Sequence, residues 1–235
     1  MWINLTEIKG FALDLVFPKT CLLCLQEKEF LCATCAKTLT FREPSCFVCR
    51  KRDLEGKTCP SCREKTLIRR FYRPFSYKDE TVRKLIHVYK YERAKEIARP
   101  LGGFIISAMQ KAGFPRKKTI TIIPIPLHWR KKRERGFNQT EPLAEIIGAF
   151  FGLPVLSETL IRTKNTSAQI EMENNLLRRQ NITGAFAVKN PAAVVEKTIL
   201  LIDDVITSGA TVEEAAATLK KAGARSVWLA AIAGR

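Results

Sequence analysis

The 235-residue sequence lacks any long apolar run. No stretch reaches the about 18 consecutive apolar residues that a membrane-spanning helix requires, so we expect no membrane insertion. Residues 1–17 have neither the basic start nor the small-residue cleavage site of a secretory signal, and their apolar positions fit one face of a packing helix. These absences predict a cytoplasmic protein.

Acidic residues are few relative to basic ones, 23 against 40, which gives a formal net charge of +17. Such a charge favours polyanionic partners, either nucleic acid or phosphorylated metabolites. A basic protein that is merely soluble is the alternative. The excess is concentrated between residues 116 and 139, where Glu134 is the sole acid among these basic residues: Arg116, Lys117, Lys118, Arg130, Lys131, Lys132, Arg133 and Arg135.

Cysteine is absent after residue 62, and the eight cysteines before that point form four Cys-x-x-Cys pairs: Cys21/Cys24, Cys32/Cys35, Cys46/Cys49 and Cys59/Cys62. Two such pairs complete a closed tetrahedral site, so the region is predicted to hold two structural Zn²⁺ ions. Disulfides are the alternative, but strict pairing and a reducing compartment disfavour them. Sequential pairing and an interleaved cross-brace both stay open.

No Gly-x-x-x-x-Gly-Lys phosphate loop occurs, which disfavours a nucleoside triphosphatase. The most informative segment is residues 199–211. Four apolar residues followed by Asp203 and Asp204 predict a buried parallel strand, and a helix is expected from about 212 to 222. In an open α/β sheet, the crevice between such a strand and its helix is where ligands bind.

The turn of this segment offers clustered backbone N–H groups and hydroxyls, which suit a phosphate dianion. Two carboxylates beside an anion site suit a vicinal diol or a bridging Mg²⁺. The predicted ligand therefore carries a 5-phosphate, a ribose 2,3-diol and a metal-bound pyrophosphate. An ordinary strand followed by an Asp-capped helix is the alternative.

A second β-branched strand is predicted at residues 119–123. Pro124 ends it, and Pro126 helps to fix the exit loop that runs to His128. The basic block follows as a loop, then Arg-Gly-Phe-Asn-Gln at 135–139 and a helix through residue 150. A positive loop at the carboxyl end of a strand is where we expect pyrophosphate. The alternative for His128 is a residue that packs within the loop.

Residues 160–162 and 185–188 are predicted as strands that flank a polar stretch, 163–183. About twenty polar residues within a compact domain indicate a functional lid. With a last buried strand at 226–232, the pattern predicts an α/β domain with a parallel sheet flanked by helices. We place the domain boundary near residue 66, with an N-terminal helix and double zinc ribbon in 1–66 and the α/β domain in 67–235.

These features resemble the ComF (ComFC) family, whose competence-associated members carry a zinc-ribbon head on a phosphoribosyltransferase-like domain. Residues 199–211 are similar to the phosphoribosyl pyrophosphate (PRPP) motif of type I phosphoribosyltransferases. Arg162, Thr163, Gln169, Arg178, Asn181 and residues 184–186 are similar to the ComF pattern and to the lid of amidophosphoribosyltransferases. Those enzymes need a cysteine after Met1, where this chain has Trp2, so ammonia delivery from glutamine is not expected.

The resemblance implies a type I phosphoribosyltransferase fold and a role for each motif residue. Asp203 and Asp204 are implied to bind the ribose hydroxyls and to be the catalytic acids. The implied 5-phosphate contacts are Val205, Thr207, Ser208, Gly209, Ala210 and Thr211. The implied residues on the pyrophosphate side are Pro124, Pro126, His128 and Arg135.

The resemblance also implies a role in DNA uptake during natural transformation, with PRPP and Mg²⁺ at the acidic strand. Single-stranded DNA would bind the basic segment through Arg130, Lys131, Lys132, Arg133 and Arg135. A third option is that the zinc head docks a helicase or another DNA-uptake protein, because zinc ribbons more often bind macromolecules than catalyse. The alternative function is an active phosphoribosyltransferase of nucleotide metabolism with an unidentified acceptor.

Overall fold

The computed structural model describes residues 20–27, 29–91, 94–115, 117, 119–165 and 182–235. The chain divides into two compact units, residues 1–40 and 41–235. The first unit contains helix α2 (Ala33–Thr38) and four of the eight cysteines. The predicted N-terminal helix lies outside the described residues, and the domain boundary near residue 66 stays a prediction.

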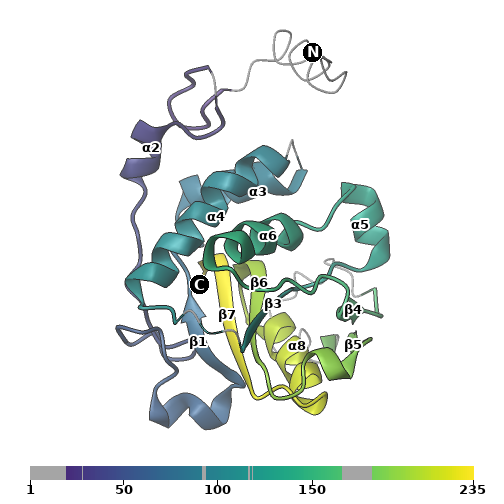
Figure 1. Ribbon diagram of the computed structural model, residues 1–235. Helices are drawn as coiled ribbons and strands as arrows, with labels where there is room; N and C mark the ends of the chain where they lie inside the picture. Colours follow the sequence, from purple (N-terminus) through teal and green to yellow (C-terminus); the bar gives the residue numbers. More distant parts are fainter. Residues whose placement is uncertain (1–19, 28, 92–93, 116, 118, 166–181) are drawn as a thin grey trace. The chain divides into compact units, whose positions relative to one another are not determined.

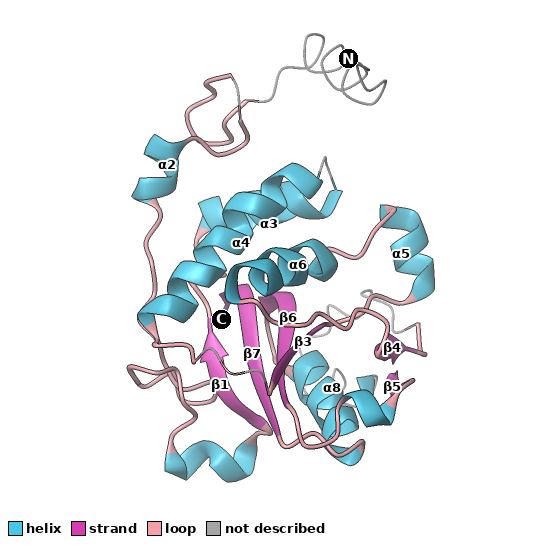
Figure 2. Cartoon of the chain, in the orientation of Figure 1, coloured by secondary structure: helices cyan, strands magenta, loops and turns pink. Residues whose placement is uncertain are grey.

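A parallel sheet forms the centre of the second unit (Figure 2). Its order is β1 (Ile68–Tyr72), β7 (Ser226–Gly234), β6 (Thr198–Ile206) and β3 (Ile120–Pro124), and β2 (Phe75–Ser76) pairs with the end of β7. All of these pairings are parallel. The strands are rich in buried β-branched residues because both faces of a parallel sheet are covered.

Helices cover both faces of this sheet (Figure 1). Helices α4 (Ala94–Lys111) and α6 (Thr140–Phe151) pack on one face, α3 (Glu80–Tyr91) packs against α4, and α8 (Ala210–Lys221) covers the other face. Along β6, Ile199 and Leu201 join the core cluster beneath α8, whereas Leu200 and Ile202 lie buried on the opposite face. The predicted α/β fold with a parallel sheet is confirmed.

The remaining elements are short. Strands β4 (Leu160–Arg162) and β5 (Phe186–Val188) form a separate antiparallel pair at the two ends of the predicted lid. Most of that lid, residues 166–181, lies outside the described residues. Helix α5 spans Trp129–Arg135, and the 3₁₀ helices η1 and η2 span Pro60–Lys65 and Pro191–Ala193. Among the described residues, no helix has both the length and the apolar character to cross a bilayer.

Candidate functional site

The predicted acidic strand and its turn are present, and the strand is longer than expected. Asp203 and Asp204 lie within β6, which continues through Ile206 in register with β7. Thr207 and Ser208 then lie exposed, and Gly209 begins α8 in the left-handed conformation at φ 79°. A strand therefore delivers two acids and an exposed turn to the N-terminus of a 12-residue helix, whose first N–H groups favour an anion.

An ion pair occupies the side of the strand that faces α3. Lys90 Nζ lies 3.1 Å from Asp204 Oδ2, and only 23% and 14% of the two side chains are exposed. Burial lowers the pKa of Lys90, but the charge and hydrogen bond of Asp204 outweigh this effect and leave that pKa raised. Lys90 is thus a charged site residue that the sequence analysis missed, because nothing local distinguishes it from other helical lysines.

Asp203 is half-buried, and its Oδ1 accepts a hydrogen bond from the Asp204 N–H at 2.8 Å. Burial, and then the charge of the neighbouring Asp204, raise the pKa of Asp203 to about 7. The positive charges of Lys90 and Arg162 act in the opposite direction. The two acids therefore differ at neutral pH: Asp204 is paired with a lysine, and Asp203 is poised to lose a proton when a cation or a diol arrives.

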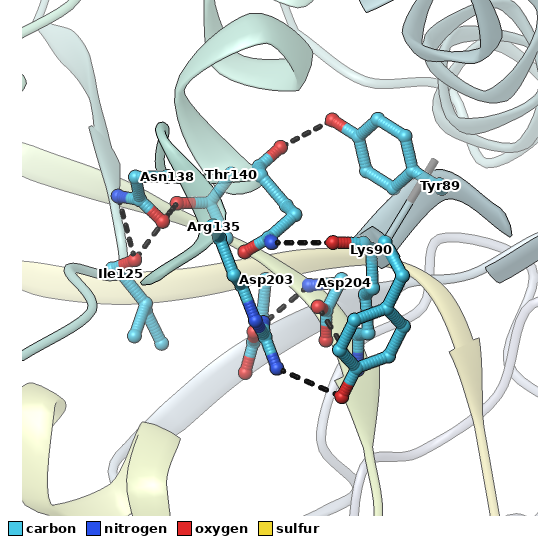
Figure 3. A network of polar contacts seen from close by, with 10 residues as sticks. Tyr89, Lys90, Ile125, Arg135, Asn138, Thr140, Asp203 and Asp204 are labelled. Carbon is cyan, nitrogen blue, oxygen red and sulfur yellow. Dashed lines mark hydrogen bonds and ion pairs between the residues drawn. The ribbon is translucent and has the colours of Figure 1, made fainter. Parts of the chain in front are cut away.

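The motif at 135–139 acts as a polar clamp beside these acids. Asn138 Nδ2 and Thr140 Oγ1 donate to the carbonyl of Ile125, at 3.3 and 2.7 Å, in the loop that leaves β3. Gln139 Nε2 donates to the backbone carbonyl of Lys90 at 3.4 Å, and the Tyr89 hydroxyl donates to the carbonyl of Gln139 (Figure 3). The clamp therefore joins the end of α3, which carries Lys90, to the exit loop of β3 and the start of α6.

The exit loop itself is held against β6. Pro124 is the last residue of β3 and is buried, and the next residue, Ile125, donates its N–H to the carbonyl of Ile202 at 2.9 Å. Pro126 is half-buried. The exit loop that the prolines predicted is present, and it runs beside the acidic end of β6.

The basic block is a helix, α5, and the expectation of a loop was wrong. His128 caps its start by accepting from the N–H of Arg130 at 3.4 Å, and Gly136 ends it in the left-handed conformation at φ 77°. His128 is only 5% exposed. Burial, and then the charges of Arg130, Arg162 and Lys131, lower the pKa of His128, which favours the neutral imidazole that this bond requires.

The cations of α5 separate into two groups. Arg135 donates to the Tyr91 hydroxyl at 3.3 Å (Figure 3), and its charge acts on Lys90, the partner of Asp204. Burial, and then the charges of Arg162 and Arg135, lower the pKa of Lys131, which places Lys131 among the cations of the site. The other group is exposed and comprises Arg130, Lys132 and Arg133, of which Lys132 pairs with Glu141 at 2.9 Å.

Arg162, at the end of β4, is a second residue that the sequence analysis did not place among the ligand contacts. Burial lowers the pKa of Arg162, and the charge of Asp203 opposes this effect. Its guanidinium lies over the ring of Phe186 at 5.6 Å. The residue that precedes the predicted lid is therefore within electrostatic reach of the acidic strand.

The cysteines gather into two clusters, and the grouping is sequential. Cys21, Cys24, Cys32 and Cys35 form one cluster, and Cys46, Cys49, Cys59 and Cys62 form the other, with the sulfurs of each set within 4.8 Å of one another. All eight thiols are free of disulfides.

The geometry of both clusters fits zinc. The Sγ atoms of Cys24 and Cys32 lie 3.7 Å apart, and those of Cys49 and Cys59 lie 3.6 Å apart. A tetrahedral ion with Zn–S bonds of about 2.3 Å requires sulfurs separated by about 3.8 Å. Four thiolates would close each site to water, so the expected role of the metal is structural.

Comparison with known families identifies two regions of the chain. Residues 139–235 match the phosphoribosyl transferase domain, and residues 12–63 match the double zinc ribbon domain. A DNA utilization protein YhgH from Salmonella typhi is 29% identical over 91% of this chain and 96% of its own length. Competence protein F from Haemophilus influenzae is 28% identical over 86% of this chain and 84% of its own length.

A solved structure, the glutamine PRPP amidotransferase from B. subtilis, aligns with a TM-score of 0.41 and 17% identity. The alignment covers 62% of this chain and 30% of that enzyme. With a phosphoribosyl transferase domain, a double zinc ribbon built on two four-cysteine clusters, and relatives that match over most of their length, this chain belongs to the ComF/ComFC family.

Proposed function

We propose that this chain binds PRPP together with Mg²⁺ and acts in DNA uptake during natural transformation. The observation that carries the proposal is the placement of Asp203, Asp204 and the Gly209 turn at one end of β6, beside a set of cations from other elements. Those cations are Lys90, Lys131, Arg135 and Arg162. Opposite charges arranged in this way match a sugar that carries a diol, a phosphate and a metal-bound pyrophosphate.

Each part of the ligand has a counterpart in the site. The ribose hydroxyls would donate to Asp203 and Asp204, and the 5-phosphate would accept from N–H groups and hydroxyls of residues 205–211 at the start of α8. The pyrophosphate would lie toward Arg135 and the loop of Pro124, Pro126 and His128. Mg²⁺, bound with the substrate, would supply charge neutralisation of the pyrophosphate oxygens.

Titration calorimetry with PRPP and Mg²⁺ tests this site directly. The wild-type chain should bind, and Asp204→Asn should weaken binding about 10- to 100-fold, because a hydrogen bond to a charged group contributes about 1.5–3 kcal/mol. Glu145→Gln, an exposed acid on α6, is the matched control and should bind as the wild type does. Absence of heat with the wild type, or equal binding by the Asp204 variant, would reject the proposal.

The DNA-uptake role is supported by two independent features. One is the names of the relatives, a DNA utilization protein and a competence protein. The other is the exposed group on α5, Arg130, Lys132 and Arg133, beside Trp129, which is 59% exposed. Arginine and lysine would contact phosphates of single-stranded DNA, and an exposed indole can stack on a base.

Turnover of PRPP is the second candidate function. The cluster of cations around the two acids favours it, because positive charge stabilises the pyrophosphate that departs in phosphoribosyl transfer. The acceptor is unidentified. Release of pyrophosphate from Mg²⁺–PRPP in the presence of a panel of nucleobases and amines would support an enzyme, and binding without release would leave a PRPP-dependent binding protein.

A protein partner of the uptake machinery, such as a helicase, would dock on the first unit. Leu25 supports this placement, because its side chain is 74% exposed on the first cysteine cluster. Leu25→Ser in the full chain should weaken association with a purified uptake helicase and leave PRPP binding unchanged. Equal association of both forms would exclude this contact.

A further inference from the structure

Phe47 connects the second cysteine cluster to the core of the α/β domain. It follows Cys46 in the knuckle, yet it is only 7% exposed and belongs to the same apolar cluster as Ile206 and Ala210. Its ring meets the ring of Phe71, on β1, edge to face at a centroid distance of 5.3 Å. Phe47, which lies between the predicted zinc ligands Cys46 and Cys49 in the sequence, is therefore a core residue of the α/β domain.

The Phe47 ring also lies directly against the phosphate turn. A Cβ added to Gly209 would stand 3.1 Å from Cζ of Phe47, which is tighter than ordinary contact. Gly209 has a φ of +79° and marks the point where the turn enters α8. The ring therefore supports the backbone whose N–H groups face the proposed 5-phosphate.

Arg50 reinforces this arrangement from the other end of the knuckle. Its guanidinium lies 5.5 Å from the centroid of Phe47 and 5.3 Å from that of Phe71. Arg50 directly follows Cys49, one of the predicted zinc ligands. Four thiolates around Zn²⁺ would carry a net charge of −2, so a metal-filled cluster would help to hold this cation over both rings.

A second contact joins the end of the cluster to α8. Thr66 and Leu67 follow Cys62 closely in the chain. The hydroxyl of Thr66 donates to the carboxylate of Glu213, and the N–H of Leu67 donates to Oε2 of the same carboxylate at 3.1 Å. Glu213 is in the first turn of α8. The same helix N-terminus is therefore held from both ends of the second cluster.

We propose that the second zinc cluster is part of the PRPP site: metal binding by Cys46, Cys49, Cys59 and Cys62 holds Phe47 against Gly209 and so fixes the phosphate turn. This inference rests on the proposed function. Phe47 is a positioning residue, since it acts on the ligand through the backbone of the turn. Because linkage is reciprocal, a bound phosphoribosyl ligand must also tighten the hold of the second cluster on its zinc.

The test compares Phe47→Ala with Val48→Ala, a neighbour in the same knuckle that is 37% exposed. Both variants should retain two zinc ions per chain by elemental analysis. Calorimetry with Mg²⁺–PRPP should show about tenfold weaker binding for Phe47→Ala, a loss of about 1.4 kcal/mol. Val48→Ala should bind as the wild type does, and Phe47→Leu should recover part of the affinity because it refills the space with apolar atoms.

A second measurement uses the wild-type chain and so does not depend on the variant folding. Zinc transfer to a colorimetric chelator is followed with and without saturating Mg²⁺–PRPP. The ligand should slow the loss of one of the two zinc ions and leave the other unchanged, and Phe47→Ala should lose this protection.

The outcomes separate the two proposals. A wild type that binds PRPP, with equal affinity in Phe47→Ala and no protection of zinc, rejects the coupling alone. A wild type that does not bind PRPP rejects the proposed function and the coupling with it.

Discussion

Lys90 Nζ contacts Asp204 Oδ2 at 3.1 Å, so the last turn of α3 supplies the counter-charge for the acidic end of β6. The pair is mostly buried, and the backbone of Lys90 is itself held by Gln139. A lysine fixed in this way pairs with Asp204 before any ligand arrives. It also adds positive charge where a pyrophosphate would bind.

Replacing Lys90 by methionine should therefore destabilise the protein and weaken ligand binding. Asp204 would be left mostly buried without its partner, which costs about 1–3 kcal/mol of unfolding free energy. Urea denaturation at pH 7 measures this loss. Lys84→Met, an exposed lysine on the same helix, is the matched control and should change the unfolding free energy by less than about 0.5 kcal/mol. Equal stability of the two variants would contradict the structural role of the pair.

Asp203→Asn should change how stability depends on pH. The pKa of Asp203 is raised from 3.8 in an ordinary setting to about 7 in the folded chain. The folded state therefore binds more protons than the unfolded state between about pH 4 and 7, and its stability falls as pH rises through that window.

The asparagine variant does not lose stability in this way. The unfolding free energy of the variant minus that of the wild type should therefore rise by about 2 kcal/mol from pH 4 to pH 7.5. This value is below the full equivalent of the shift because the carboxyl is partly accessible to water. Denaturation in the absence of ligand at several pH values measures it. A difference between the two proteins that is constant with pH would contradict the assignment.

Gly209→Ala should weaken PRPP binding more than its backbone strain alone explains. The left-handed φ of 79° costs an alanine about 1 kcal/mol, and the new Cβ would also press on Phe47 at 3.1 Å. Gly152→Ala separates the two effects, because Gly152 has a similar φ of 66° and open space where its Cβ would lie.

Calorimetry and thermal unfolding of both variants provide the comparison. Gly152→Ala should lose stability alone, whereas Gly209→Ala should lose stability and at least tenfold in affinity for Mg²⁺–PRPP. Unchanged affinity in Gly209→Ala would show that this turn does not hold the phosphate.

Neutralising the exposed cations of α5 should weaken binding of single-stranded DNA in a salt-dependent manner. The triple variant Arg130→Gln, Lys132→Gln and Arg133→Gln should reduce the slope of log affinity against log salt by about 0.7 for each DNA phosphate that the protein no longer neutralises. Fluorescence anisotropy with a labelled oligonucleotide at several salt concentrations measures the slope. A charge-matched control changes three exposed lysines elsewhere, Lys78, Lys189 and Lys221. Equal slopes for the two triple variants would show that α5 does not bind the DNA.

The sequence alone determined the local parts of this protein. The apolar run before Asp203 predicted the central strand, the prolines after residue 123 predicted the exit loop, and the Cys-x-x-Cys spacing predicted zinc knuckles. These predictions held because each depends on a few consecutive residues: burial of a parallel strand, the fixed φ of proline, and the reach of two thiolates to one metal ion. The basic segment was mistaken for a loop because its helix depends on two caps, His128 and Gly136, that flank a charged run.

Only the tertiary structure decided which residues lie next to these strands, loops and zinc knuckles. The approach of Lys90 and Arg162 to the two acids and the contact of Phe47 with Gly209 join segments that are far apart in the chain. The structure also decided between the two groupings of the cysteines that the spacing left open. The sequence around a helical lysine or a phenylalanine in a zinc knuckle does not indicate which distant residue that side chain will contact. Only the placement of α3, β4 and the second cluster near the end of β6 brings these residues together in the proposed site.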